Sequence, residues 1–585
     1  MLPEYFEFYM PTRVAYGIGL TQNLREITDG FGHRKALLVT DEILNQIGIV
    51  AKVKTGFAET NIQIVATFDQ VPPNSTIETV EACARLARQK KCDMIIGLGG
   101  GSVMDTAKVA NILAVKGGRV EDHMGAYLLG NDELLPIILI PTTAGTGSEV
   151  TKVAVITDTR NDIKLPFAET QFFPQLAILD PELTTSMPAS LTAATGMDAL
   201  THAIECYVSK DSQPASDALA LHVIKLINQH LVRACLHPED LKARGAMLVA
   251  SCLAGIAFTQ AMVGMVHGIS HALGGVYHIP HGVANALVLP EVMEYNLETQ
   301  QERYADIARA LGVAYPQPVQ TVQAMLHLAR ADFAVRLLQP TRVIDSWLQQ
   351  ATARAGIVRI RELLRQLGAV AKLPLNLEQA GVQDNLAKLE QVCETAMVDG
   401  SMLYNPREPS IEAVKSIVEK LFKQNPTPLP VKESDLAQTY EQTHKPVLKN
   451  VFDSSNMLYS VLGEFYQALK SDPALRDKLL DSKLVVQFVY DEPDARITID
   501  ASDKEVQIFL GDSYQGTPEV IMSMKADFAH LFWQGKVNLI TALTRRQVKS
   551  RGNVPKAVKL LPILKPAYEL YPRYLEQRGL ERLIA

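Results

Sequence analysis

One stretch of the sequence, MIIGLGGGSVMDTAK at residues 94–108, decides how the first part of the chain folds. The apolar run Met94–Leu98 predicts a buried strand, and a helical pattern begins at Val103. The glycines between them allow the backbone to approach a bound group, and the first free N–H groups of the helix favour a negative charge. The stretch is therefore typical of a pyrophosphate-binding turn. It departs from the GxGxxG pattern because Ser102 stands where the third glycine, counted from Gly97, would fall, so an ordinary tight turn stays open.

Short apolar runs alternate with helical patterns on both sides of this stretch, which predicts βαβ units around a mostly parallel sheet. The expected strands are Ala36–Thr40, Gln63–Thr67, Met94–Leu98, Pro136–Ile140, Val153–Ile156 and Leu176–Asp180. Thr76–Lys90 is an expected helix between two of them. A second polar loop, Pro141–Glu149, follows the fourth strand and favours a nucleotide site. Asp41 follows the first strand, where a carboxylate can hold a ribose hydroxyl; an ordinary helix N-cap is the alternative.

Length and composition limit the class of protein. The chain has 585 residues, which is too many for one ordinary core, so two or three domains are expected. A net charge of −7 provides no basic field for nucleic acid or an anionic membrane. The six cysteines include no CxxC pair, and the N-terminus carries acidic residues where a signal peptide needs basic ones. We therefore expect reduced thiols, a cytoplasmic location and no nucleic-acid partner.

From about Met187 to Phe422 the pattern is helical nearly throughout. Within it, residues 245–290 contain no Asp, Glu, Lys or Arg, a length that invites assignment as a transmembrane span. The run is rich in Ala, Gly, Ser and His and contains Thr259 and Gln260. This composition fits a helix that is buried on all sides within a protein core better than a transmembrane helix. We therefore predict no transmembrane segment.

Potential metal ligands cluster in this helical part. Asp198 and His202 are four residues apart and share one helix face, and His267 and His271 repeat that spacing. His281 follows soon after. A lone histidine here would more often be a hydrogen-bonded core residue, but several imidazoles and a carboxylate are costly to bury unless something binds them. The pattern predicts a site for Fe²⁺ or Zn²⁺ with positions left for substrate, although spacing does not say which of the five is not a ligand.

Four ordered blocks of the sequence resemble the signature of the iron-containing (type III) alcohol dehydrogenase family. These blocks are Gly99–Lys108, Pro141–Thr151, Ala194–Ile204 and His267–Asn285. Residues 405–407, Asn-Pro-Arg, are similar to that family's closing motif, so the resemblance covers about residues 1–424. It implies an α/β NAD-binding domain (1–182), an all-helical metal-binding domain (183–422) and an active site in the cleft. It implies hydride transfer between a primary alcohol or aldehyde and NAD.

The resemblance also assigns roles to individual residues. It implies that Asp198, His202, His267 and His281 bind the metal and that His271 lies beside the nicotinamide as a proton-relay group. The residues implied for NAD binding are Asp41, Asn74, Gly100, Gly101, Ser102, Asp105, Thr142, Thr143, Thr151 and Lys164.

This sequence departs from the family pattern in several places. Gln260 and Met262 stand where the family usually has Asn and Gly, and Ala272 replaces a common Pro. We expect these changes to reshape the substrate side of the pocket, so the substrate cannot be taken from a relative. An insertion around residues 321–352 has no clear family counterpart.

A proline-containing linker is expected at residues 423–446, followed by a small α+β domain at 447–585. The domain begins with a helical run, Met457–Leu480. Its expected strands are Leu484–Tyr490, Ala495–Asp500 and Glu505–Leu510. Four segments resemble the sterol carrier protein type 2 family: Glu505–Leu510, Val520–Lys525, Asp527–Gly535 and Val554–Leu564. The resemblance implies a five-stranded sheet with helices around an apolar tunnel for a fatty-acyl or sterol-like ligand; an ordinary small core is the alternative.

Our interpretation is a metal-dependent alcohol dehydrogenase with a C-terminal module for apolar ligands, acting on a long-chain or lipid-like alcohol. We also expect a homo-oligomer. One alternative is a lipid carrier with a vestigial dehydrogenase portion, which the presence of all the named metal and cofactor residues disfavours. Another is a zinc-dependent polyol dehydrogenase of the same fold, which the set of one Asp and three His disfavours.

Overall fold

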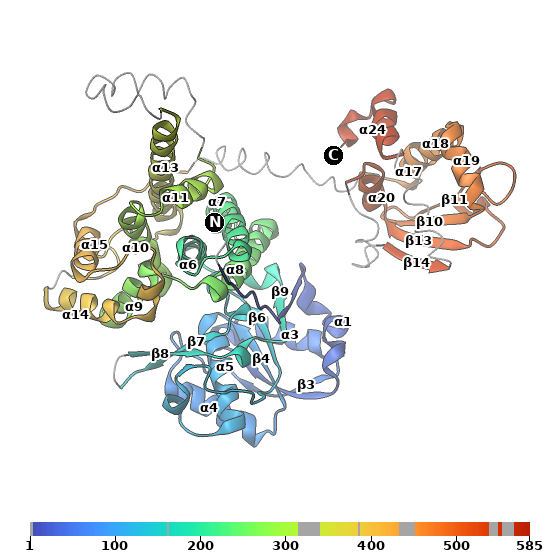
Figure 1. The fold of residues 1–585 in the computed structure, drawn as a ribbon. Coiled ribbons are helices and arrows are strands. Elements are labelled where there is room, and N and C mark those ends of the chain that lie inside the picture. Colours follow the sequence, from blue (N-terminus) through green and yellow to red (C-terminus); the bar gives the residue numbers. More distant parts are fainter. Residues whose placement is uncertain are drawn as a thin grey trace. The chain divides into compact units, whose positions relative to one another are not determined.

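The computed structural model describes residues 4–160, 163–313, 340–383, 386–431, 451–536, 548–552 and 567–584. The chain divides into two compact units, Met1–Asp435 and Leu436–Ala585 (Figure 1). The first unit changes from an α/β part to a helical part between residues 179 and 189, and its end falls inside the predicted linker.

The α/β part is built on a six-stranded parallel sheet with the order β1-β9-β6-β4-β2-β3. Its strands are β1 (Arg13–Tyr16), β2 (Arg34–Val39), β3 (Ile62–Phe68), β4 (Met94–Gly99), β6 (Ile137–Pro141) and β9 (Leu176–Leu179). Five of the predicted strands belong to this sheet. The sixth, predicted at Val153–Ile156, is β7 (Val153–Asp158). It belongs to a separate small sheet with β5 (Gly125–Ala126) and β8 (Ile163–Ala168), in the order β5-β8-β7.

Helices cover both faces of the large sheet. On β2, Leu37 and Val39 point into the core formed with α4 (Ile77–Gln89) and α5 (Gly101–Lys116). Ala36 and Leu38, which alternate with them, point into the core formed with α3 (Ile49–Phe57). Burial on both faces explains why these strands read as continuous apolar runs.

The helical part consists of long helices packed on one another. They are α6 (Ala189–Val208), α7 (Pro214–Leu236), α8 (Leu241–Ala261), α9 (Met265–Tyr277), α10 (His281–Asn296), α11 (Gln301–Ala310), α13 (Pro340–Ala371), α14 (Leu386–Met397) and α15 (Ile411–Lys423). In the described part of the chain α8 alone is long and apolar enough to cross a membrane, and most of its residues are buried in a position where α6 and α7 pack against it. The predicted insertion at 321–352 lies largely outside the described residues.

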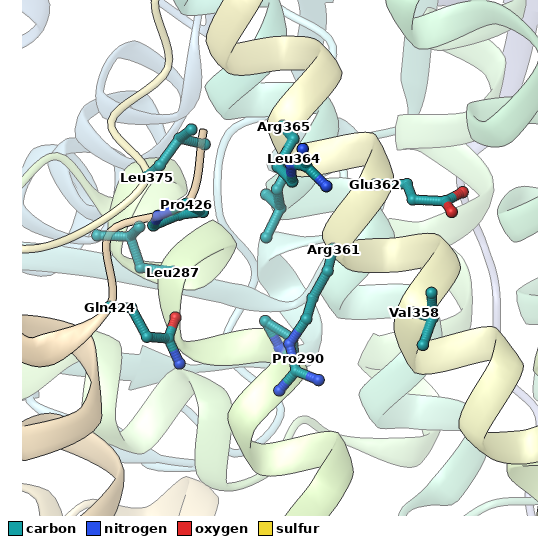
Figure 2. Close-up of a pocket in the computed structure, with 10 residues that line it drawn as sticks. All are labelled: Leu287, Pro290, Val358, Arg361, Glu362, Leu364, Arg365, Leu375, Gln424 and Pro426. Atoms are coloured by element: carbon teal, nitrogen blue, oxygen red, sulfur yellow. The ribbon is translucent and has the colours of Figure 1, made fainter. Parts of the chain in front are cut away.

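The first residues of the predicted linker are fixed to the helical part. Leu429 N donates to Arg365 O (2.9 Å), and Arg365 Nε donates to Thr427 O (2.6 Å). Pro426 lines a cavity of about 280 Å³ together with Leu287 and Leu375 (Figure 2). The proline segment is therefore held on the helical part as far as Leu429, and residues 432–446 of the predicted linker lie outside the described residues.

The C-terminal unit contains a five-stranded sheet in the order β12-β11-β10-β13-β14, as the second resemblance implied. The strands are β10 (Val485–Asp491), β11 (Ala495–Asp500), β12 (Gln507–Leu510), β13 (Val520–Lys525) and β14 (Val548–Gly552). The helices beside it are α17 (Ser455–Leu458), α18 (Glu464–Ser471), α19 (Pro473–Ser482), α20 (Ala526–Trp533) and α24 (Ala567–Gln577). The predicted helical run 457–480 is interrupted because Asp472 caps a new helix that begins at Pro473. The block at 554–564 lies outside the described residues.

Candidate metal centre and cofactor loops

Three helices bring the predicted metal ligands together. Asp198 and His202 lie on the buried face of α6, His267 lies in the first turn of α9, and His281 is the first residue of α10. Asp198 Oδ1 lies 3.9 Å from His202 Nε2, 3.8 Å from His267 Nε2 and 3.4 Å from His281 Nε2. Gly282 allows α10 to approach α6, since a Cβ there would lie 2.3 Å from Ala194 O.

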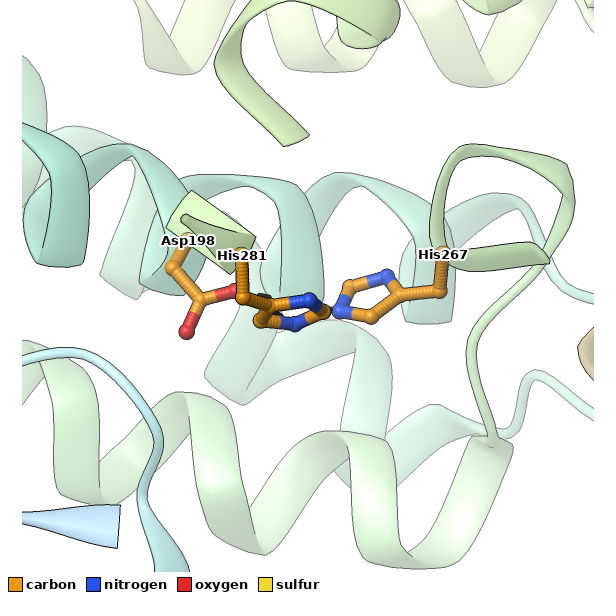
Figure 3. A group of neighbouring side chains, drawn as sticks. All are labelled: Asp198, His267 and His281. Carbon is orange, nitrogen blue, oxygen red and sulfur yellow. Dashed lines mark ion pairs between the residues drawn. The ribbon is translucent and has the colours of Figure 1, made fainter. Parts of the chain in front are cut away.

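Three of these four residues form the tightest group. Ligand atoms of Asp198, His267 and His281 lie within 4.8 Å of one another, and Figure 3 shows the three side chains converging. His202 lies beside them with its ring stacked on Phe258 (centroids 4.3 Å apart) and on His267 (4.7 Å). The arrangement is that of a site with one carboxylate and several imidazoles.

Burial and mutual charge give these groups the protonation states that a cation needs. Burial lowers the pKa of His267 well below its ordinary value and that of His281 to about 4, so both rings are neutral near pH 7. Burial opposes ionisation of Asp198, but His202, His281 and His267 outweigh it and lower the pKa of that carboxyl. Neutral imidazole nitrogens and a carboxylate are ligands of Fe²⁺ and Zn²⁺.

The side chain of Asn285 shows that the acceptor atoms of this group face a common point. Its Nδ2 donates to Asp198 Oδ1 (2.7 Å) and lies 3.1 Å from His281 Nε2 and 3.3 Å from His267 Nε2. The three acceptor atoms thus converge on a single donor, and His202 Nδ1 is buried with no hydrogen-bond partner among the described residues. The donor set fits a divalent first-row ion.

His271 stands apart from the ligand group. Its ring stacks on that of His281 (centroids 5.2 Å apart), and its side chain is 33% exposed, compared with 3% for His267. Its Nδ1 lies 2.8 Å from Asp399 Oδ2. Burial opposes ionisation of Asp399, but the hydrogen bond and charge of His271 hold the pKa of that carboxyl well below its usual range. Sequence reasoning missed Asp399.

The glycine-rich turn forms as predicted at the start of α5. Asn74 N donates to Ser102 Oγ (3.1 Å), and Lys164 Nζ donates to Asn74 Oδ1 (3.2 Å), so three of the predicted cofactor residues meet here. Asn74 has a positive φ of 58°. Lys164, from β8, adds a positive charge beside the N-terminus of α5, where an anion is favoured.

The second polar loop lies against the first. Thr142 N donates to Gly99 O (3.0 Å). A Cβ on Gly100 would lie 3.2 Å from Thr143, and a Cβ on Gly101 would lie 2.8 Å from Thr146, so larger residues at the turn would displace this loop. The two loops that the sequence singled out therefore form one structure.

A buried lysine that sequence reasoning missed holds this loop in place. Lys108 Nζ lies 2.7–3.1 Å from five oxygens of Ser148, Thr151 and Val153. Burial lowers its pKa to about 8. Asp105 accepts from Ser148 Oγ (2.9 Å) and from Val155 N (3.0 Å). Asp105 and Thr151 thus make internal contacts in the structure, and their predicted role in cofactor binding stays a prediction.

Asp41 serves as the N-cap of α2 (Glu42–Gln46). Its Oδ1 accepts from Leu44 N (2.9 Å), and burial raises the pKa of its carboxyl. The alternative reading of this residue as a helix cap is confirmed. Its contact with the ribose stays a prediction, compatible with its place at the end of β2.

The cofactor loop and the metal helices are in contact. A Cβ on Gly145 would lie within 2.6–2.9 Å of Thr195 on α6, three residues before Asp198. Gly147, at φ +61°, packs against Gly255 of α8, whose Cα would lie 2.6 Å from an added Cβ. The second polar loop therefore rests on α6, the helix that carries Asp198 and His202.

The two departures on α8 have structural consequences. Gln260 exchanges hydrogen bonds with the backbone of Tyr9 (2.8 and 3.3 Å) and so fixes the N-terminal segment. Met262 ends α8 at φ 62° and ψ 173°, a conformation that suits glycine. The glycine usual at this position is explained by the backbone.

Comparison with known proteins agrees with this architecture. Residues 11–181 match the model of the family described as iron-containing alcohol dehydrogenase, and residues 192–346 match that of the Fe-containing alcohol dehydrogenase family, C-terminal. Residues 465–565 match the SCP-2 sterol transfer family.

Individual relatives match about 70% of this chain. The NAD-dependent methanol dehydrogenase of Bacillus methanolicus is 41% identical over 412 residues, which are 70% of this chain and 98% of that protein. The 1,3-propanediol dehydrogenase of Citrobacter freundii is 37% identical over 419 residues, 71% of this chain and 99% of that protein. A crystal structure of 1,3-propanediol oxidoreductase superposes with a TM-score of 0.63 at 35% identity, covering 72% of this chain and all of that one. The chain therefore belongs to the iron-containing alcohol dehydrogenase family and carries a C-terminal domain of the SCP-2 sterol transfer family.

Proposed function

We propose that the protein interconverts a primary alcohol and its aldehyde with NAD, using Fe²⁺ or Zn²⁺ held by Asp198, His202, His267 and His281. The observation that carries the proposal is the convergence of one carboxylate and three imidazole nitrogens within 3.4–3.9 Å. The glycine-rich turn lies against the second polar loop, and that loop contacts α6 through Gly145 and Thr195, which supports hydride transfer next to this group.

The chemistry divides between the bound groups and the protein. A divalent ion there supplies a Lewis acid for the alcohol oxygen, and NAD supplies the hydride acceptor. His271 takes the alcohol proton at Nε2, because Asp399 keeps the other proton of the ring on Nδ1. The backbone N–H groups at the start of α5 and the ammonium of Lys164 hold the pyrophosphate.

We further propose that the substrate is a long-chain or lipid-like alcohol, which the C-terminal unit supplies. The SCP-2 match and an apolar cluster enclosed by the five-stranded sheet and its helices support this substrate class. A tethered carrier raises the concentration of a bound ligand near the active site to about the millimolar range for a short linker.

A homo-oligomer and a cytosolic location complete the proposal. The edge strand β1 leaves Val14 and Tyr16 exposed (39% and 49%), an edge that pairing with a second copy would cover. All six cysteines are free, as expected in a reducing compartment. Light scattering of the purified protein tests the oligomer.

One experiment tests the proposed activity directly. The metal-stripped full-length protein is reloaded with Fe²⁺ or Zn²⁺, and NADH formation is measured with primary alcohols of increasing chain length. We expect turnover only after reloading, with the best kcat/KM for long chains. Absence of turnover with every alcohol would indicate that the dehydrogenase portion is vestigial. Preference for a polyol would indicate a zinc-dependent polyol dehydrogenase.

A further inference from the structure

Glu205 is a buried carboxylate next to the proposed metal ligands. It follows Asp198 and His202 on α6 at the spacing of one helix face, and its side chain is only 4% exposed. Among the described residues no lysine or arginine forms an ion pair with it. A buried carboxylate without a cationic partner needs strong hydrogen-bond donors.

The donors come from the start of α9. Glu205 Oε1 accepts from Val266 N (2.6 Å), and Oε2 lies 2.5 Å from His267 Nδ1. Gly264, which precedes the helix, offers no side-chain cap of its own, and a Cβ there would lie 3.2 Å from Glu205 Oε1. Glu205 therefore caps α9 from the neighbouring helix and binds the first ligand of α9 with the same carboxylate.

This contact fixes how His267 faces the other ligands. An imidazole that donates Nδ1–H to a carboxylate keeps the lone pair on Nε2, and His267 Nε2 points toward Asp198 Oδ1 at 3.8 Å. We infer that Glu205 is a positioning residue of the metal centre, which holds the His267 tautomer and ties α9 to α6. The inference rests on the metal site proposed above and adds a residue outside the ligand set.

Asn405 provides a matched control. Its Oδ1 accepts from Met265 N (3.4 Å) and from Asn296 Nδ2 (2.9 Å), so it caps the same helix end without contacting a proposed ligand. A merely structural role for Glu205 would make variants of the two residues behave alike.

The experiment measures the affinity of the full-length apoprotein for Zn²⁺ by competition with a chelator, together with the Tm of the apoprotein. Glu205→Gln keeps an acceptor for Val266 N but loses the charge, and its amide can donate to His267 Nδ1 and favour the wrong tautomer. We expect its Zn²⁺ Kd to rise about 10–100-fold. Asn405→Ala should lower the Tm and leave the Kd within about threefold of the wild type.

The outcomes separate this inference from the proposed function. If the wild type binds Zn²⁺ and Glu205→Gln binds it equally well, or if Asn405→Ala weakens binding as much, the positioning role is overturned while the metal site stands. If the wild type binds no Zn²⁺, both fail. Should Glu205→Gln not fold, Glu205→Asp replaces it: faster release of Zn²⁺ supports the role, and an unchanged release rate overturns it.

Discussion

His271 Nδ1 and Asp399 Oδ2 lie 2.8 Å apart and join α9 to the segment that follows α14. The carboxylate also caps the turn at residues 400–404 by accepting from Ser401 N (2.8 Å). Its position is therefore fixed on both sides. The pair lies beside the ligand group, and the ring of His271 stacks on that of His281.

The pair should affect the rate and leave metal binding intact. We expect His271→Ala to lower kcat by about 10²–10⁴-fold, because the proton then lacks its acceptor. Asp399→Asn, which can still cap Ser401, should lower kcat by a smaller factor. Both should retain metal in elemental analysis, whereas His281→Ala should lose metal and activity. An empty site in His271→Ala with a loaded one in His281→Ala would contradict the ligand assignment.

Cofactor choice should depend on the charge of Asp41. Its carboxylate would face the additional phosphate of NADP, so we expect a preference for NAD of about 1–3 kcal/mol. Asp41→Asn keeps a cap for Leu44 N and removes the charge, so it should narrow the ratio of the two kcat/KM values without loss of stability. A wild-type enzyme that prefers NADP would disprove the assignment.

Glu149 should make the protein less stable as the pH rises. The residue is buried in the second cofactor loop, its Oε1 has no hydrogen-bond partner among the described residues, and burial raises its pKa from 4.5 to about 7. The folded state thus keeps a proton that the unfolded chain releases, so stability falls between pH 4.5 and about pH 7.

Glu149→Gln should remove this decrease. One pKa unit corresponds to about 1.4 kcal/mol. We therefore expect the free energy of unfolding of the variant to exceed that of the wild type by about 3 kcal/mol at pH 8 and by little at about pH 4. Chemical denaturation at both pH values provides the measurement, with the exposed Glu59→Gln as control. Equal pH dependence in wild type and variant would mean that Glu149 is ionised in the folded protein.

Met262→Gly should stabilise the protein. The wild-type side chain is held at φ 62° and ψ 173°, which costs about 1–3 kcal/mol for a residue other than glycine. Glycine also makes the unfolded chain more flexible, which offsets part of the relieved strain. We therefore expect the free energy of unfolding to rise by about 1 kcal/mol. Thermal unfolding measures it, with Met265→Gly in the following helix expected to destabilise. A lower Tm for Met262→Gly would show that its packing outweighs the strain.

Removal of residues 431–585 should act on long substrates alone. The remaining chain corresponds to nearly the full length of its relatives and keeps the docked proline segment, so it should fold and oxidise short alcohols normally. We expect its apparent KM for long-chain alcohols to rise about tenfold or more as local delivery is lost. An equal loss of activity with ethanol and with long-chain alcohols would indicate that the C-terminal unit serves assembly or solubility.

The amino-acid sequence determined those features that depend on neighbours along the chain. Strands such as β4 are recognisable because burial on both faces demands a continuous apolar run. The pair Asp198 and His202 is recognisable because a spacing of four places two side chains on one helix face. Strand β1, which is short and mostly exposed, lacks such a run and was missed. The break at Pro473 was also missed, because the apolar periodicity continues across it.

Only the tertiary structure decided which distant residues serve the site. Glu205 and Asp399 are isolated acidic residues in a region whose sequence pattern is helical, so nothing next to them in the sequence marks them. Their partners His267 and His271 are 62 and 128 positions away. Lys108 looks like the polar face of a helix, yet its ammonium holds a loop about 40 residues further along the chain. Local periodicity records which face of an element is apolar. It contains no information on which polar group of another element will meet a buried charge, because that depends on how the helices pack.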